Sequence, residues 1–422
     1  MDSNTQEYEI IVGLDIGTSN INVVMAELIP KEKDERWEIR VVGACSVPSE
    51  GMRSGVPLNV DAAVKSVQKA IEEAELMSGQ DVKEVYVGVS GLHITAMNAK
   101  GMVTVSGRDN EITVEDVDNA IEQARTINLS SDKEIIHVLP KSFTVDEETG
   151  IIDPVGMTGV RLEVEVHIII ATTSVVQNIY RTVERAGIKV ADLVLESWAS
   201  SFAVLSPDEQ ELGVAILDFG GGTTDLAVFY ENSIQHIHSI KYSGHYVTKD
   251  VAVGLSTPMD KAEDLKIRHG ACRLTSIDKD DFVTVPGIGG RENKQVEKKD
   301  LIKFIHARME EIYMQINANL EKNKMKERLG AGIVLTGGSI LLENSAELAE
   351  EVFGLPIKVG LPKVNSGITD HICSPEYATG VGLVEYAARQ REYEARSSSS
   401  HKSNGQVKSL FRKIIQLIKE YI

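Results

Sequence analysis

The sequence has little of what marks secreted, membrane-spanning or nucleic-acid-binding proteins. It holds only three cysteines, Cys45, Cys272 and Cys373, whose wide spacing excludes a cysteine metal motif and predicts free thiols in a reducing cytoplasm. We find no signal-peptide pattern and no apolar run near the ~20 residues that a transmembrane helix needs. Acidic residues outnumber basic ones by 63 to 44, and the net charge of −19 argues against nucleic acid as a partner.

What is present is an ordinary globular composition, with 42% hydrophobic and 25% charged residues. A chain of 422 residues can form two or more domains with cores of their own. The most informative feature is a motif that occurs once in each half. This repetition predicts two related domains that face each other across a cleft. The two copies are Leu-Asp-Ile-Gly-Thr-Ser-Asn-Ile-Asn-Val-Val at 14–24 and Leu-Asp-Phe-Gly-Gly-Gly-Thr-Thr-Asp-Leu-Ala-Val at 217–228.

Each copy is predicted to be a β-hairpin whose turn binds phosphate. Glycines let backbone N–H groups approach phosphate oxygens, and neighbouring hydroxyl and amide groups add donors. Aspartates would repel phosphate directly, but carboxylates suit a hydrated Mg²⁺ ion. The candidate glycines are Gly17, Gly220, Gly221 and Gly222, the candidate polar side chains are Thr18, Ser19, Asn20, Thr223 and Thr224, and the candidate Mg²⁺ carboxylates, acting through water, are Asp15 and Asp218.

Two further segments extend this candidate site. Thr336-Gly337-Gly338-Ser339 follows the apolar 333–335 and predicts a strand, a glycine turn and a helix whose N-terminus favours an anion or a polar nucleotide edge. Glu263 and Lys266 are three residues apart on an expected helix and therefore share one face, although a solvated ion pair has the same pattern. The chain contains no GxxxxGK[ST] sequence, so a P-loop nucleotide hydrolase is not expected.

Apolar periodicity predicts an α/β chain with a module inserted between about 85 and 166. We expect the second half to begin near Leu212. Helices are expected at 60–77, 114–126, 174–186, 243–255, 262–269, 298–328 and 374–389, strands at 84–90, near 103, at 135–138, 167–171 and in 332–339, a loop at 150–157, and mixed strand and loop at 281–299.

The end of the chain differs from the body. Residues 391–406 are polar and Ser-rich and predict a flexible linker. Residues 407–422 predict an amphipathic helix about 24 Å long, too short to cross a bilayer, that lies in the plane of an anionic membrane. Packing of this helix on the body or on a partner is the alternative. Its apolar face holds Leu410, Phe411, Ile414, Ile415, Ile418 and Tyr421, and its basic residues are Lys408, Arg412, Lys413 and Lys419.

The two Asp-x-Gly hairpins, the Thr-Gly-Gly turn and the Glu263/Lys266 helix together resemble the actin–Hsp70–sugar-kinase superfamily. Within it, almost the full chain resembles the FtsA family of bacterial cell-division proteins. The most specific matches are Val-Gly-Leu-Asp-Ile-Gly-Thr-Ser at 12–19, Asp-Pro-Val-Gly-Met at 153–157, Asp-Phe-Gly-Gly-Gly-Thr-Thr-Asp at 218–225 and Gly-His-Tyr-Val-Thr-Lys-Asp at 244–250.

The resemblance implies an α/β, actin-like ATPase fold in which two related domains enclose a nucleotide cleft. It implies the following divisions: a first core at 1–84 and 167–205, an inserted α+β subdomain at 85–166, a second core at 206–242 and 311–390, a smaller subdomain at 243–310, the linker at 391–406 and the membrane-targeting helix at 407–422.

The resemblance also implies ATP and Mg²⁺ as ligands. Glu263, Lys266, Gly337, Gly338 and Ser339 would surround ribose and adenine. Glu196 occupies the segment where relatives orient the attacking water, so Glu196, Asp15 and Asp218 are the catalytic candidates. Because such proteins differ in how well they hydrolyse ATP, binding with weak or slow hydrolysis is expected.

The family role implied is structural. The protein would polymerise, tether FtsZ filaments to the cytoplasmic face of the cell membrane at the division septum, and recruit later division proteins through the 85–166 module. A basic cluster suits the acidic C-terminal tail of FtsZ, with a solvated helix face as the alternative. Its residues are Arg291, Lys294, Lys298, Lys299, Lys303 and Arg308, of which Arg291, Lys294, Lys303 and Arg308 are the candidates for tail binding.

Two other readings of the same superfamily stay open. One is another actin-like scaffold, such as a type IV pilus assembly protein, which shares the inserted module. The other is a soluble small-molecule kinase, which would have no use for a tethered membrane helix. The basic amphipathic tail and the 153–157 stretch favour the division protein.

Overall fold

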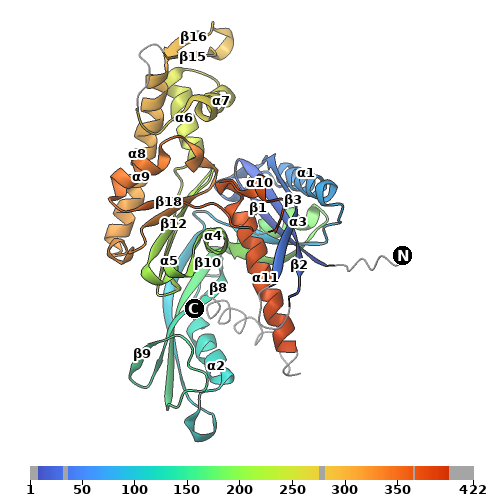
Figure 1. Ribbon diagram of the computed structural model, residues 1–422, viewed down its shortest axis with the longest axis vertical. Helices are drawn as coiled ribbons and strands as arrows, with labels where there is room; N and C mark the ends of the chain where they lie inside the picture. Colours follow the sequence, from blue (N-terminus) through green and yellow to red (C-terminus); the bar gives the residue numbers. More distant parts are fainter. Residues whose placement is uncertain (1–7, 32–36, 275–280, 365, 399–422) are drawn as a thin grey trace, which may run out of the picture.

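A computed structural model describes residues 8–31, 37–274, 281–364 and 366–398, and two β-sheets form the centre of the molecule (Figure 1). The first sheet has the strand order β11-β6-β1-β2-β3-β19. Its β1 and β2 form the first predicted hairpin, and their register places Asp15 opposite Asn22. The strands are β1 (Glu9–Ile16), β2 (Asn20–Ile29), β3 (Glu38–Pro48), β6 (Glu84–Val89), β11 (Lys189–Leu195) and β19 (Ser366–Gly367).

The second sheet repeats the plan of the first, with the order β14-β13-β12-β17-β18. Its β12 and β13 form the second predicted hairpin, with Asp218 opposite Asp225. A parallel strand lies beside the first strand of each hairpin, β6 beside β1 and β17 beside β12. The predicted internal repeat is therefore confirmed. The strands are β12 (Val214–Phe219), β13 (Thr224–Tyr230), β14 (Ser233–Ile240), β17 (Ile333–Thr336) and β18 (Ile357–Val359).

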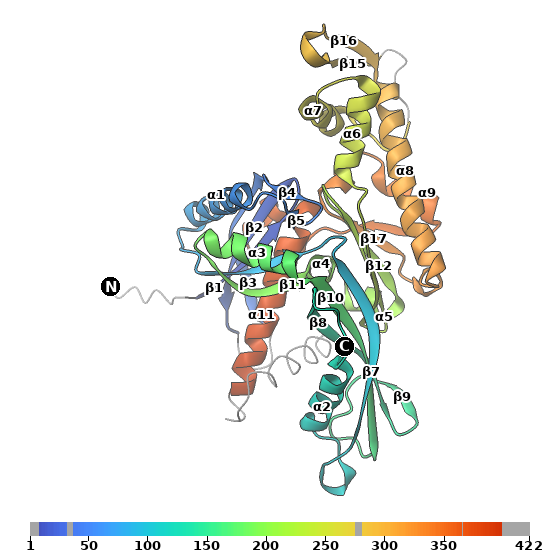
Figure 2. The same cartoon turned by 180° about the vertical axis from the view of Figure 1, so that it is seen from behind.

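The inserted module is a separate four-stranded sheet, order β7-β10-β8-β9, with one helix packed on it, and it projects from the body (Figures 1 and 2). The expected bounds of 85–166 need correction. β6 belongs to the first sheet and β10 continues to Thr172, so the module begins after Val89 and ends later than expected. Its elements are β7 (Ile94–Thr104), η1 (Arg108–Asn110), α2 (Val114–Arg125), β8 (Lys133–Val145), β9 (Glu148–Ile151), which includes part of the expected 150–157 loop, and β10 (Arg161–Thr172).

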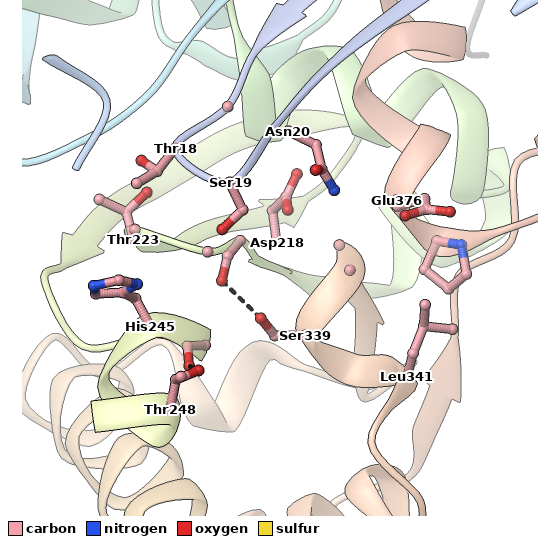
Figure 3. A pocket seen from close by; sticks show the side chains of 18 of the residues that line it. Thr18, Ser19, Asn20, Asp218, Thr223, His245, Thr248, Ser339, Leu341 and Glu376 are labelled. Atoms are coloured by element: carbon pink, nitrogen blue, oxygen red, sulfur yellow. Dashed lines mark hydrogen bonds between the residues drawn. The ribbon is translucent and has the colours of Figure 1, made fainter. Parts of the chain in front are cut away.

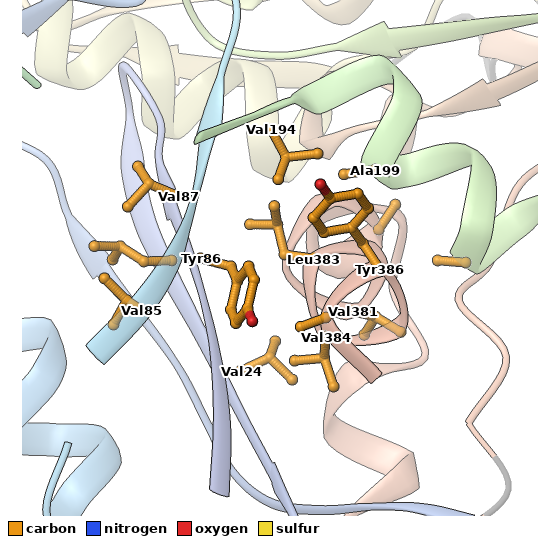
Figure 4. Packing of buried hydrophobic residues seen from close by; sticks show 14 of the residues in the cluster. Val24, Val85, Tyr86, Val87, Val194, Ala199, Val381, Leu383, Val384 and Tyr386 are labelled. Atoms are coloured by element: carbon orange, nitrogen blue, oxygen red, sulfur yellow. The ribbon is translucent and has the colours of Figure 1, made fainter. Parts of the chain in front are cut away.

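The last helix, α11 (Ala378–Ser398), packs against the first sheet and α4, although the expected divisions put residues up to 390 in the second core. Figure 4 shows its Leu383 and Tyr386 among side chains of β6 and α4. The approach is close, because a Cβ on Gly13 of β1 would lie 2.5 Å from the Gly380 oxygen. The chain therefore crosses back to its first half.

The remaining elements of the body surround the two sheets. They are β4 (Met52–Arg53), β5 (Val56–Pro57), α1 (Val60–Ser78), α3 (Thr173–Arg185), α4 (Glu196–Val204), α5 (Pro207–Leu212), α10 (Thr369–Ile372) and η5 (Pro375–Tyr377).

A helical subdomain continues from the second sheet at the opposite end of the molecule from the module (Figure 1). α8 (Lys298–Lys322) ends six residues before the expected Arg328, and the 3-10 turn η3 (Lys326–Arg328) follows it. The Thr-Gly-Gly turn leads into the short 3-10 turn η4 (Gly338–Leu341) instead of an α-helix. The other elements are α6 (Gly244–Leu255), α7 (Met259–His269), β15 (Phe282–Val285), η2 (Ile288–Gly290), β16 (Lys294–Glu297) and α9 (Ser345–Phe353).

The structure describes the first part of the expected linker, up to Ser398. α11 continues to Ser398, so the expected linker is wrong for its first eight residues. The predicted membrane helix at 407–422 lies outside the described residues. Within the described part of the chain, no helix combines the length and apolarity needed to cross a membrane.

Candidate functional site

A cavity of about 850 Å³ lies where the two hairpins, α6, α7 and the Thr-Gly-Gly turn meet (Figure 3). Its volume suits a small organic ligand. It brings together residues that are far apart in the sequence. The predicted residues that line it are Asp15, Gly17, Thr18, Ser19, Asn20, Glu196, Asp218, Gly220, Gly221, Gly222, Thr223, Glu263, Lys266, Gly337, Gly338 and Ser339.

Thr224 is the exception among the predicted cofactor residues. It is fully buried in β13, and its hydroxyl donates to the carbonyl oxygen of Tyr242 (2.8 Å). It does not line the cavity, because neighbouring residues of a strand point to opposite faces and Thr223 takes the cavity side. Thr224 instead ties the second hairpin to the start of α6.

The turns of the two hairpins are in direct contact across the cavity. A Cβ on Gly221 would collide with the side chain of Ser19, and one on Gly222 with that of Thr18. The turn between β4 and β5 joins them, since the Ser54 hydroxyl donates to the Gly222 oxygen (3.3 Å). Glycine is therefore required at these positions for close approach, in addition to exposing backbone N–H groups.

Four carboxyl groups cluster behind the hairpins, and burial is the main cause of their shifted pKa values. Burial, with the nearby Asp218 charge, raises the pKa of Asp15 to about 7 against the lowering effect of its hydrogen bond from Asn22. Burial raises the pKa of Asp225 to about 6, and it also raises the pKa of Asp218. Burial, reinforced by Asp15 and Asp225, raises the pKa of Glu196 well above its ordinary value. Such a cluster is poorly stabilised as four anions and favours a cation.

Hydroxyl and amide groups hold these carboxylates in place. Ser200 and Thr379 donate to Asp218 Oδ2 at 3.2 and 3.1 Å, and Asn22 Nδ2 donates to Asp15 Oδ2 at 3.1 Å. The Asn22 amide oxygen is buried and has no hydrogen-bond partner in the described part of the chain. Within the described residues, no three His, Cys, Asp or Glu side chains are arranged to ligate a metal directly. The buried carboxylates of Asp15 and Asp218 are oxygen donors of the kind that suits a hydrated Mg²⁺ ion.

Sequence reasoning missed Asn22 and Asp225. Both line the cavity, and both lie opposite the motif aspartate of their own hairpin, at the same sequence offset of seven. A two-residue alternation counted back from each turn could have found them. His245, Thr248 and Glu376 also line the cavity. His245 and Thr248 belong to the 244–250 motif, which marked the family resemblance without giving either residue a role in the site.

Glu263 and Lys266 form an ion pair on α7 (2.8 Å), as their spacing predicted. Lys266 is buried, and its Nζ also donates to the Thr248 hydroxyl (3.0 Å) and the Gly244 oxygen (3.3 Å), while Thr248 donates to Glu263. These bonds fix the pair against α6. The pair is therefore part of the cavity wall and not a solvated surface pair.

The Thr-Gly-Gly turn closes the cavity from the second sheet. Gly337 adopts φ +86°, and a Cβ there would lie 2.5 Å from the Asp218 carboxylate, so no larger residue fits. Ser339 donates its hydroxyl to the Gly220 oxygen (2.8 Å), the dashed bond in Figure 3. This turn thus sets the position of the second hairpin.

The predicted basic cluster lies away from the cavity, on η2, β16 and α8. Arg291 and Lys294 are exposed. Lys303 pairs with Asp300 (2.8 Å), and Arg308 pairs with Asp250 and Glu311. Much of the expected positive charge is therefore balanced by acids of the same subdomain.

Two family models that match this chain, and three of its relatives, name the same family. The family model "Cell division protein FtsA" matches residues 215–382, and the model "SHS2 domain inserted in FTSA" matches residues 91–170, within the module seen here. The chain is 37% identical over 390 residues to cell division protein FtsA of Pseudomonas aeruginosa, covering 92% of each chain. It is 37% identical over 387 residues to FtsA of Escherichia coli K12, covering 90% of each, and 36% identical over 388 residues to FtsA of Bacillus subtilis, covering 92% of this chain and 86% of the relative.

Solved structures with the same architecture are more distant in sequence. One is a PilM-PilN type IV pilus biogenesis complex (TM-score 0.63, 15% identity, 90% of this chain and 98% of that chain). Another is MreB5 of Spiroplasma citri bound to ADP (TM-score 0.56, 13% identity, 93% of this chain and 99% of that chain). At these identities the likeness shows the fold alone, and the predicted actin-like α/β class is confirmed.

Proposed function

This chain belongs to the FtsA family of cell-division proteins, and from that premise we propose that it binds ATP with Mg²⁺ between its two sheets. The observation that carries the proposal is the direct contact of the two glycine turns, Gly221 on Ser19 and Gly222 on Thr18. The phosphates of one nucleotide can then accept hydrogen bonds from N–H and hydroxyl groups of both halves of the chain. Nucleotide binding would hold the halves together.

The carboxyl cluster suits the metal. Asp15 and Asp218 would hold the waters of a Mg²⁺ ion, with Asp225 beside them, and the ion would supply the positive charge that these three buried carboxyl groups and the half-buried Glu196 lack. Glu196 would orient an attacking water. Burial and the neighbouring carboxylates raise the pKa of Glu196, and a bound cation would oppose this shift by favouring the ionised form.

The nucleoside would occupy the other end of the cavity. Lys266 and Glu263 present a buried ammonium group and a carboxylate that suit ribose hydroxyls. Gly337, Gly338 and Ser339 provide a turn without bulky side chains, against which a flat base can lie.

In the cell we propose a structural role at the cytoplasmic face of the membrane at the septum. Family membership supports self-association into polymers, capture of the FtsZ tail on the subdomain at 243–310, and recruitment of later division proteins by the inserted module. The exposed Arg291 and Lys294 offer charge that matches an acidic tail. The basic amphipathic sequence at 407–422 supports membrane attachment, and polymerisation would strengthen it by avidity.

Flotation with anionic liposomes tests this role. We expect the full chain to float and a chain ending at Gln406 to stay soluble, with Mg-ATP increasing flotation of the full chain. Ile414→Asp together with Ile418→Asp, at full length, is the matched control for loss of the apolar face alone. If both the full and the shortened chain remain soluble, the tether is wrong, and a pilus-type scaffold or a soluble kinase becomes the better reading of the same fold.

A further inference from the structure

The cavity lining is short of positive charge. Among the residues that the structure describes, the lysine and arginine of this lining are Lys266 and Arg268, both on α7, whereas carboxyl groups come from several elements. Lys266 is already bonded to Glu263, Thr248 and the Gly244 oxygen. The hairpin turns themselves contribute only neutral donors. A ligand with several phosphates therefore meets few cationic groups besides any bound metal.

His245 is a side chain that can add a hydrogen-bond donor or a positive charge to the cavity beside the two hairpin turns. It lies in the first turn of α6, and its backbone N–H donates to the Gly221 oxygen (2.9 Å), which fixes it beside the second glycine turn. Its side chain is exposed and lines the cavity. Figure 3 shows its ring at the same end of the cavity as Thr18 and Thr223, away from Leu341 and Glu376.

We infer that His245 contacts the terminal phosphate of a bound nucleoside triphosphate and so makes the site prefer triphosphate over diphosphate. The inference rests on the proposed nucleotide site. With the nucleoside between α7 and the Gly337 turn, the phosphates would run along the two hairpin turns, and the last phosphate would lie beside Thr18, Thr223 and His245. An imidazole N–H donates to a phosphate oxygen in either charge state, and the protonated ring adds a charge-assisted bond.

The helix gives this contact a fixed geometry. Gly244 and His245 donate their N–H groups to the Gly220 and Gly221 oxygens (3.2 and 2.9 Å), so α6 and the second hairpin form one unit. A ligand contact at His245 is thereby linked to the turn that faces Thr18 of the other half. His245 is a specificity residue in this account, and the carboxyl cluster keeps its separate role.

Titration of Mg-ATP and Mg-ADP into the full chain by calorimetry tests the inference. We expect His245→Ala to weaken Mg-ATP binding about tenfold, equal to about 1.4 kcal/mol, and Mg-ADP binding less than about threefold. His245→Lys keeps a cation and His245→Gln keeps an N–H donor, so both should recover part of the preference. Lys249→Ala removes a charge from an exposed position of the same helix outside the lining and should change neither affinity.

The outcomes separate the inference from the function on which it rests. If the unaltered chain binds neither nucleotide, the proposed nucleotide site itself fails. If it binds both and His245→Ala lowers both affinities by one common factor, or lowers neither, the inference is overturned while the nucleotide site stands. Thermal unfolding of each variant without ligand identifies a folding defect, which would move both affinities together and leave their ratio unchanged.

Discussion

Replacing Asp15 by asparagine is expected to stabilise the nucleotide-free protein at alkaline pH. Burial raises the pKa of Asp15 from its ordinary value of 3.8 to about 7 in the folded chain. Between these values the folded protein keeps a proton that the unfolded chain has lost, so stability falls as pH rises. Over roughly three pH units, at about 1.4 kcal/mol per unit, the loss reaches about 4 kcal/mol above pH 7.

Asp15→Asn keeps the shape of the side chain and an oxygen that can accept from Asn22, but it cannot ionise. We therefore expect the variant to exceed the unaltered chain in stability by about 2–4 kcal/mol at pH 8, with the difference shrinking toward pH 5. Saturating Mg-ATP should reduce or reverse this difference, because the proposed Mg²⁺ site uses the ionised carboxylate and the ligand would then stabilise the unaltered chain more than the variant.

Urea and thermal unfolding in EDTA at pH 5, 6, 7 and 8 measure this effect. Asp81→Asn, at an exposed position of the same half, is the matched control and should follow the unaltered chain at every pH. Parallel curves for Asp15→Asn and the unaltered chain would refute the reasoning.

Two other changes probe the packing. Gly221→Ala places a methyl group against Ser19 and should lower Mg-ATP affinity by about tenfold or more, measured by calorimetry. Arg391→Ala removes the ion pairs of α11 with β1 and with Glu84 (2.8 and 2.9 Å) and should lower the free energy of unfolding by about 1 kcal/mol, with Arg391→Lys losing less. An unchanged Mg-ATP affinity of Gly221→Ala, or an unfolding midpoint for Arg391→Ala unchanged from the original, would contradict these expectations.

Patterns among residues that are close in the sequence predicted many residues of the candidate site. The run Asp-Ile-Gly-Thr-Ser-Asn, flanked by apolar stretches, fixes a hairpin, since strand alternation and glycine turns depend on neighbours in the sequence. The same holds for the Glu263–Lys266 pair and for the helix at 60–77, which the structure has as Val60–Ser78. Asn22 and Asp225 were within reach of the same reasoning, because hairpin register places them opposite the motif aspartates.

Long-range packing decided the rest. An apolar helix face at 378–388 does not say which sheet it covers, and only the tertiary structure brings α11 back to β1, where Gly13 meets Gly380. It also decides that β6 belongs to the first sheet and that Arg308 is paired. The sequence by itself determined the repeated hairpins and their chemistry. The pKa shifts of four carboxyl groups and the contact between the two turns arise only when distant segments exclude water together, because desolvation depends on everything that surrounds a group.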